Sequence, residues 1–202
     1  MIKIRWDNIV INWEWLEVDI LEREEKWEEA KLLLIKSWRQ NPQDIIVAIR
    51  LGFFAWNILV EEGPLGITDE DVDFDELETV LKEVTHFGMA NFITNEDFLW
   101  CFGYMTSLFP DHFGDYDYWE EKGISMLKHA YELFPNEPVY SYSYFASFSN
   151  TPKKSLKEVC YKVQAVLEER FQGEGGVLSE YFKGVWQNSQ IHEKSVKLWE
   201  DF

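Results

Sequence analysis

Apolar residues recur along this chain at the spacing that places them on one face of an α-helix. Between residues 155 and 171 the apolar positions are Leu156, Val159, Cys160, Val163, Val166, Leu167 and Phe171. This is the i, i+3, i+4, i+7 stripe of an amphipathic helix, and the segment from 74 to 87 repeats it. The prolines fall between such segments, where residues that cannot continue a helix belong. The pattern predicts an all-α fold.

The periodic segments predict eight helices, near residues 10–23, 26–40, 43–61, 74–88, 95–108, 117–134, 138–149 and 154–171. A ninth, short helix is expected from about Val177 to Asn188, after the glycine-rich break at 173–176. Two strand-like alternations stay open, one at Ile2, Ile4 and Trp6 and one from Tyr140 to Tyr144. The first is too short to support a sheet, whereas the second competes with the helix expected there.

Two helix starts carry capping signals. Thr68 is followed by three acidic residues just before the stripe that begins at Phe74, and Asn95 is followed by Glu96 and Asp97. A Thr or Asn cap with acidic residues in the first turn suits the positive end of a helix. We therefore expect helices to begin close to these two positions.

The composition suits a single helical domain. The chain has 202 residues and is expected to form one domain over 1–202, with an irregular acidic insertion near 61–75. Ten Trp, nine Tyr and fifteen Phe against eleven Gly favour long helices over a turn-rich β-sandwich. The first residues lack a secretory signal, and the longest apolar run, 45–60, contains Arg50 and is too short for a membrane span. Cys101 and Cys160 lack CxxC spacing, so we expect reduced thiols in a cytoplasmic protein.

Two segments resemble each other in their order of large and small residues. They are 27–42, with Trp27, Ala30, Leu34, Ser37 and Pro42, and 119–135, with Trp119, Gly123, Leu127, Ala130 and Pro135. Small residues on one helical face let a neighbouring helix approach closely, and the proline ends the helix. Leu51-Gly52 and Phe102-Gly103 add a large–small pair inside what would be the first helix of a hairpin.

The segment 27–42 resembles the second helix of a repeat in the tetratricopeptide family of helical hairpins. Leu51 and Gly52 fall where the next repeat's first helix carries its Leu-Gly pair. The match is looser at 119–135, where the aromatic residue is shifted by one position. The resemblance covers about 26–56 and 98–146, and it implies antiparallel hairpins stacked as a short superhelix with a concave, partner-binding face. The alternative is another antiparallel helical bundle, which would also need small residues and proline turns.

The negative charge of the chain is concentrated in its middle third. The net charge is -18, and residues 61–122 hold seventeen acidic residues against only Lys82 and Lys122. A chain this acidic is not expected to bind nucleic acid through its phosphates or to attach to anionic lipid. A field of one sign steers a basic protein toward the surface that carries it. The alternative is a solvated acidic face that serves solubility.

The residues predicted to bind a partner form two clusters in this middle third. The first acidic cluster is Asp69, Glu70, Asp71, Asp73, Asp75 and Glu76. The second acidic cluster is Asp111, Asp115, Tyr116, Asp117, Tyr118, Trp119, Glu120 and Glu121. Aromatic side chains beside charges are typical of interface centres, so the three aromatic residues of the second cluster are predicted anchors.

The sequence predicts neither a catalytic nor a metal site. Asp71, Asp73 and Asp75 have the opening spacing of a calcium loop, but Glu76 stands where glycine is needed and Lys82 where the bidentate acid belongs. The four histidines are dispersed, without a zinc-binding spacing. Phosphate-binding loops, nucleophile elbows and dinucleotide fingerprints do not occur. We expect a protein that is not an enzyme and uses no cofactor.

The leading functional hypothesis is an acidic module that binds a basic protein partner. In general character the chain resembles the immunity proteins of bacterial toxin–immunity systems. That resemblance implies binding to a basic toxin, such as a nuclease, and blocking of its active surface, with carboxylates imitating phosphates. The alternative is a tetratricopeptide-type adaptor or chaperone that holds a peptide in its groove, where Arg50 and Asn57 would be groove residues. The oligomeric state is left open.

Overall fold

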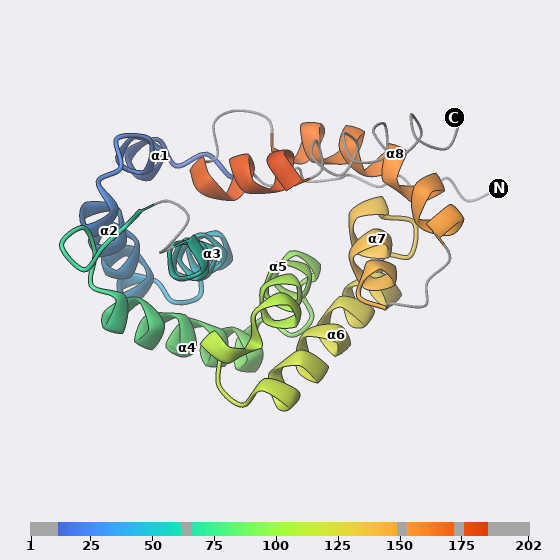
Figure 1. Cartoon of the computed structure of the whole chain (residues 1–202), viewed down its shortest axis with the longest axis horizontal. Helices are drawn as coiled ribbons and strands as arrows, with labels where there is room; N and C mark the ends of the chain where they lie inside the picture. Colours follow the sequence, from blue (N-terminus) through green and yellow to red (C-terminus); the bar gives the residue numbers. More distant parts are fainter. Residues whose placement is uncertain (1–11, 62–65, 149–152, 172–175, 186–202) are drawn as a thin grey trace.

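The computed structural model describes residues 12–61, 66–148, 153–171 and 176–185, with backbone only for 153–161 (Figure 1). Every regular element in these ranges is a helix, so the predicted all-α class is confirmed. Among the described helices, none combines the length and the apolar run that a membrane crossing needs. The possible strand at Ile2, Ile4 and Trp6 lies outside the described residues.

The helices begin and end close to the predicted positions. They are α1 (Leu16–Arg23), α2 (Trp27–Gln40), α3 (Ile45–Glu61), α4 (Phe74–Asn91), α5 (Glu96–Leu108), η1 (Pro110–His112), α6 (Tyr116–Leu133), α7 (Pro138–Ala146) and α8 (Lys153–Arg170). A further helical segment covers 176–185, which we call the C-terminal segment. Helix α7 resolves the alternation from Tyr140 to Tyr144 as helix.

The prediction that the first helix starts near residue 10 is wrong, because α1 begins at Leu16. The backbone before it is held in another conformation by side chains. Asn12 Oδ1 accepts a hydrogen bond from Glu14 N at 3.0 Å, and Asp19 Oδ2 accepts one from Trp15 N at 2.9 Å. The second of these bonds satisfies an N–H at the helix start, where no helical carbonyl is available.

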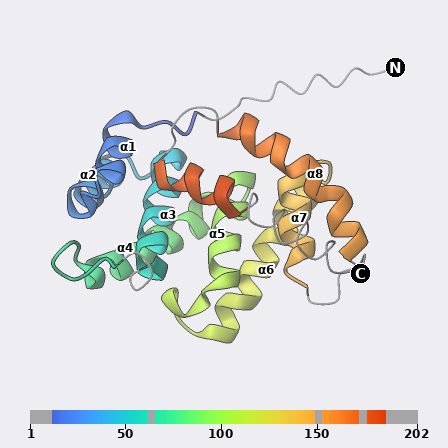
Figure 2. The same ribbon diagram turned by 45° about the horizontal axis from the view of Figure 1, so that its top comes forward.

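Helices α1 to α7 follow one another along an arc, and α8 and the C-terminal segment lie across its open side (Figure 1). Helices adjacent in sequence pack together: α3 on α4, α5 on α6 and α7 on α8, while α3 also packs on α5. Turning the molecule shows the C-terminal segment, in red, crossing over α3 and α5 (Figure 2).

Glycines lie where the helices approach most closely. A Cβ atom at Gly52 in α3 would lie 2.3 Å from the ring of Phe102 in α5. A Cβ atom at Gly123 in α6 would lie 2.5 Å from the backbone nitrogen of Ser107 and 2.6 Å from Thr106 Oγ1. The small residues singled out by the repeat pattern therefore set the spacing between helices, as ridge-into-groove packing requires.

Aromatic residues fix the C-terminal segment over the inner helices. The ring centroid of Phe182 lies 5.5 Å from that of Phe53 in α3 and 4.5 Å from that of Trp100 in α5. Tyr181 meets Trp56 of α3 at 5.4 Å in an edge-to-face arrangement. Contacts of this geometry add to the free energy of burying the rings themselves. The face that α3 and α5 turn toward the inside of the arc is thus covered by the C-terminal segment.

Candidate functional site

The first acidic cluster lies in the loop before α4 and in the first turn of α4. Three of its carboxylates stabilise local structure. Asp71 Oδ2 accepts hydrogen bonds from Thr68 N and Thr68 Oγ1, both at 2.9 Å, and Asp73 caps α4 by accepting from Glu76 N at 2.9 Å. Glu76 itself pairs with the buried ammonium of Lys31 at 2.8 Å. Asp69, Glu70 and Asp75 are exposed.

The second acidic cluster spans η1 and the start of α6. Asp115 caps α6 by accepting a hydrogen bond from Tyr118 N at 3.0 Å. Asp111, Asp117 and Glu121 are exposed, and Glu120 is half-buried. Tyr116 and Tyr118 keep 47% and 57% of their surface exposed, so these two rings are accessible beside the carboxylates.

Trp119 differs from the other two aromatic residues of this cluster, because only 6% of it is exposed. Its ring lies 5.8 Å from Phe113 and 5.7 Å from His86 of α4, measured between centroids. The residue falls on the same helical face as Gly123 and Met126, which pack inward. Its ring is therefore engaged within the fold rather than presented to a partner.

The structure places the two clusters toward opposite ends of α4. The first cluster caps α4 at Asp73, and the second reaches α4 through the contact between Trp119 and His86. The thirteen residues from Phe74 to His86 span roughly 20 Å of helix. Helices α4 and α6 line the same edge of the molecule, away from α8 (Figure 1). The clusters form two separate patches along one edge.

A buried ion cluster that the sequence did not predict lies between α1 and α3. Arg50 of α3 is 1% exposed; its Nη2 donates to Asp19 Oδ1 at 2.7 Å and to Glu22 Oε2 at 3.2 Å. Its Nη1 donates to the backbone oxygen of Trp13 at 2.7 Å. Buried charges require partners of this kind, because an unpaired charge away from water is costly. Arg50 thereby ties α1 to α3.

Glu22 links the ion cluster to the C-terminal segment. Its Oε2 accepts a hydrogen bond from Val177 N at 2.9 Å, and its Oε1 is buried without a hydrogen-bond partner among the described residues. Burial raises the pKa of the Glu22 carboxyl to about 7, against the lowering effects of the Arg50 guanidinium and of the Val177 hydrogen bond. A Cβ atom at Gly176 would lie 1.8 Å from Glu22 Oε2, so only glycine fits there.

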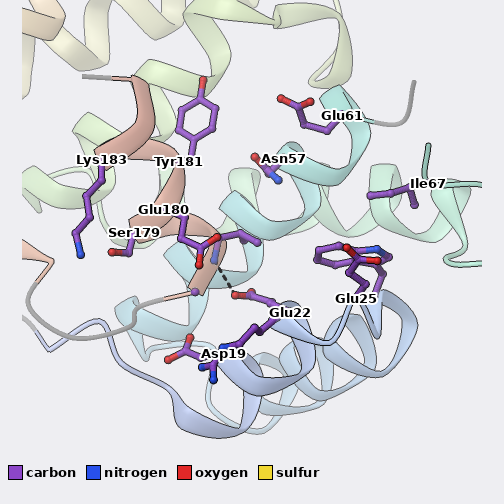
Figure 3. Close-up of a pocket in the computed structure, with 14 residues that line it drawn as sticks. Asp19, Glu22, Glu25, Asn57, Glu61, Ile67, Ser179, Glu180, Tyr181 and Lys183 are labelled. Atoms are coloured by element: carbon purple, nitrogen blue, oxygen red, sulfur yellow. Dashed lines mark hydrogen bonds between the residues drawn. The ribbon is translucent and has the colours of Figure 1, made fainter. Parts of the chain in front are cut away.

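A pocket of about 660 Å³ opens beside this cluster, between α1, the start of α2, α3 and the C-terminal segment (Figure 3). We call it the α1/α3 pocket. Its lining residues are Asp19, Glu22, Arg23, Glu25, Trp27, Asn57, Glu61, Ile67, Gly176, Val177, Ser179, Glu180, Tyr181 and Lys183. In Figure 3, Lys183 lies on the opposite side of the C-terminal segment from Asn57 and Glu61. Carboxylates outnumber cations in this lining, so the pocket is acidic.

A second buried network holds α8 against α5 and α7. Arg170 donates to Asp97 and to the hydroxyl of Tyr140, the latter at 3.1 Å, and Tyr140 donates to Asp97 at 2.8 Å. The guanidinium carbon of Arg170 also lies 5.3 Å from the ring centroid of Trp100. Asp97, Tyr140 and Arg170 each have a partner inside the fold, so their network serves the structure.

In the part of the chain that the structure describes, no three His, Cys, Asp or Glu side chains converge to hold a metal ion. The buried thiol of Cys101 has a raised pKa because of burial, which disfavours the reactive thiolate. The described residues present two exposed acidic patches and one acidic pocket. No family model matches the chain, and comparisons with curated proteins and with solved structures find no match.

Proposed function

We propose that this chain is a cytoplasmic binding module that captures a basic protein through its two acidic clusters. One observation carries the proposal. Between residues 66 and 122 ten carboxylates are exposed: Asp69, Glu70, Asp71, Asp73, Asp75, Glu83, Asp111, Asp115, Asp117 and Glu121. The two lysines of that stretch are both half-buried, and Lys82 is paired with Glu78 at 2.5 Å. The exposed charge of this edge is therefore almost entirely negative.

Such an edge acts first on the rate of association. A surface of one sign attracts an oppositely charged protein over several ångströms and orients it before contact. Tyr116 and Tyr118 would then supply apolar contact area at the second cluster, as tyrosines do in many interfaces. In the more specific form of the proposal the partner is a bacterial toxin with a basic active surface, and the chain is its immunity protein.

We further propose that α1 to α8 form a degenerate stack of tetratricopeptide-like hairpins. The packing of α3 on α4, α5 on α6 and α7 on α8 supports it, as does the placing of α4 and α6 on the outer side of the arc (Figure 1). In this arrangement the acidic clusters belong to the outer helices. Partner binding would then use the convex edge rather than the concave face that such repeats often use.

The adaptor alternative requires an open groove, and the packing of the C-terminal segment argues against it. Phe182 and Tyr181 fill the inner face of α3 and α5. The adaptor alternative expects Arg50 to line the peptide groove. The guanidinium of Arg50 is instead hydrogen-bonded to Asp19 and Glu22. A peptide would have to displace the C-terminal segment to enter.

Affinity capture from a lysate of the source cell, at low and at high salt, tests the proposed function. The bait is the full chain, compared with two triple variants that spare the capping and ion-paired carboxylates. The variants are Asp69→Asn/Glu70→Gln/Asp75→Asn and Asp111→Asn/Asp117→Asn/Glu121→Gln. The matched control removes three exposed carboxylates elsewhere, Glu17→Gln/Glu29→Gln/Glu169→Gln, and so has the same net charge.

We expect one basic protein to be retained at low salt by the wild-type chain and by the control. Both cluster variants should retain less of it, and the activity of the captured protein should be lost in the complex if the chain is an immunity protein. Retention that is equal for all four baits would contradict a role for the clusters. Many weakly held clients that are insensitive to salt would favour the adaptor.

A further inference from the structure

The α1/α3 pocket borders the first acidic cluster. Ile67, which lines the pocket, lies two residues before Asp69, and Trp27 at the pocket wall begins the helix that pairs with this loop. The loop is fixed to α2 by a hydrogen bond from Asp73 N to Glu28 Oε2 at 3.3 Å. A protein held on the first cluster would therefore have the pocket within reach of its side chains.

The lining of the pocket is suited to a positive charge. Arg50 satisfies Asp19 and one oxygen of Glu22, which leaves the carboxylates of Glu25, Glu61 and Glu180 against the cations of Arg23 and Lys183 in the lining. Carboxylates gathered in a concave site attract cations more strongly than they do on an open surface.

Asn57 and Glu22 together are an independent sign that the pocket receives a ligand. Only 6% of Asn57 is exposed, and its side chain projects from α3 into the pocket in Figure 3. The amide oxygen of Asn57 can accept from an ammonium or guanidinium group. Glu22, which also lines the pocket and is 3% exposed, has one oxygen, Oε1, that is buried without a hydrogen-bond partner among the described residues. Buried acceptors are nearly always hydrogen-bonded, because leaving one unpaired is costly.

Aromatic residues complete the site. Trp27 and Tyr181 are both half-buried and line the pocket. Their rings are held in place: Trp27 packs on Phe54 at 6.4 Å, and the Tyr181 hydroxyl lies 3.2 Å from that of Tyr104. A cation gains from an aromatic ring nearby, and the ring also covers the alkyl chain that carries the charge.

We propose that the α1/α3 pocket binds an alkyl-ammonium or guanidinium group, supplied by a lysine or arginine side chain of the basic partner. The identity of the ligand as a side chain of the partner rests on the proposed function, because free polyamines carry the same chemical group. The volume of the pocket, about 660 Å³, is in the range of small-ligand sites. Asn57 would accept a hydrogen bond from the cation, and Glu61 and Glu180 would neutralise its charge.

Titration calorimetry of the full chain with three probes tests this proposal. The probes are the blocked tripeptide Gly-Arg-Gly, the same peptide with neutral citrulline in place of arginine, and spermidine. We expect saturable binding of one equivalent of the arginine peptide and none of the citrulline peptide. Spermidine binding more tightly than the arginine peptide would support the same site and assign a free polyamine as its ligand.

Substitutions in the pocket lining test whether the arginine peptide binds there. Asn57→Leu should weaken binding of the arginine peptide by about tenfold, since it removes a hydrogen-bond acceptor inside the pocket. Glu180→Gln should weaken it by about threefold, since it removes an exposed countercharge. Glu169→Gln on α8 and the distant triple variant Asp111→Asn/Asp117→Asn/Glu121→Gln should bind it as the wild type does. Glu180 is exposed, so the test holds even if Asn57→Leu fails to fold.

The proposal is overturned if no cationic probe binds, if citrulline binds as well as arginine, or if Asn57→Leu and Glu180→Gln leave binding unchanged. These results are separate from those that test the proposed function. Failure to capture a basic protein would contradict the function without changing peptide or spermidine binding. Loss of probe binding would leave capture through the outer clusters intact.

Discussion

Arg50 Nη2 lies 2.7 Å from Oδ1 of Asp19, which stands 31 positions earlier in the chain, and both side chains are almost sealed from solvent. This pair fixes α1 against α3. Through Glu22 and its hydrogen bond from Val177 it also reaches a residue 155 positions later. The two ends of the described fold are therefore joined at one charged cluster, which forms the base of the α1/α3 pocket.

Removing Arg50 should destabilise the fold strongly. Arg50→Met leaves Asp19 and Glu22 buried without their cation, and breaking a buried pair in this way costs about 3–5 kcal/mol. Urea unfolding would measure the loss. Arg39→Met, at an exposed position of α2, is the matched control and should change the free energy of unfolding by less than about 0.5 kcal/mol. Equal losses in the two variants would show that the buried cluster is not formed.

Glu22 should make stability fall as pH rises. Its folded-state pKa is raised from 4.5 to about 7, so the folded state binds its proton more tightly than the unfolded state does. The stability associated with this proton is present below the unfolded pKa and is lost as pH rises through 7. Glu22→Gln cannot ionise. Its stability relative to the wild type should therefore rise by roughly 2 kcal/mol from about pH 5 to about pH 8.

Thermal and urea unfolding of the two proteins across this pH range would test that expectation. Glu17→Gln, at an exposed position of the same helix, is the control, and its difference from the wild type should stay flat with pH. A difference between Glu22→Gln and the wild type that does not depend on pH would mean that Glu22 is not buried as described.

Two glycine-to-alanine changes should have opposite signs. At Gly123 the added methyl would lie 2.5 Å from the backbone of Ser107 in α5, so the two helices must separate, at a cost of roughly 2 kcal/mol. At Gly184 in the C-terminal segment nothing lies within 4 Å, and alanine should stabilise by about 0.5–1 kcal/mol through its helix propensity. Urea unfolding curves of both variants would measure these changes in the free energy of unfolding. Gly123→Ala as stable as the wild type would refute the close approach.

Glu25 offers a test that separates stability from binding. Its backbone φ is 57°, in the left-handed region that favours glycine. Glu25 N donates to Glu22 O at 3.1 Å, and Lys26 N donates to Leu21 O at 2.9 Å. These two hydrogen bonds form a Schellman turn, in which the position of Glu25 is usually glycine. Glu25→Gly should stabilise the chain by about 1 kcal/mol. It should also weaken the arginine peptide, because Glu25 lines the pocket. A variant that is more stable and binds equally well would remove Glu25 from the proposed site.

The helices could be predicted because their stabilising pattern is local. An apolar stripe repeats within each segment, and Asn95 caps α5 as its sequence suggested, accepting from Phe98 N at 2.9 Å. The start of α4 was harder to place. The N–H and the hydroxyl of Thr68 both donate hydrogen bonds to Asp71, which places Thr68 in a turn before the helix. The residue that caps α4 is therefore Asp73 rather than Thr68.

The pocket could not be predicted, since its residues come from segments far apart in the chain. Arg50 looked like an interruption in an apolar run, and nothing near it in sequence identifies Asp19 as its partner. Trp119 carried a usable signal: it precedes Gly123 by four residues and Met126 by seven, which places it on the buried stripe of α6.

The most direct test of the central claim is the association rate of this chain with the basic protein that capture identifies, measured across a range of salt concentrations. The wild-type rate should fall steeply as salt screens the acidic edge. Asp111→Asn/Asp117→Asn/Glu121→Gln should associate more slowly at low salt, with a flatter dependence. A rate that is indifferent to salt and equal in the two proteins would contradict the claim that the acidic clusters capture the partner.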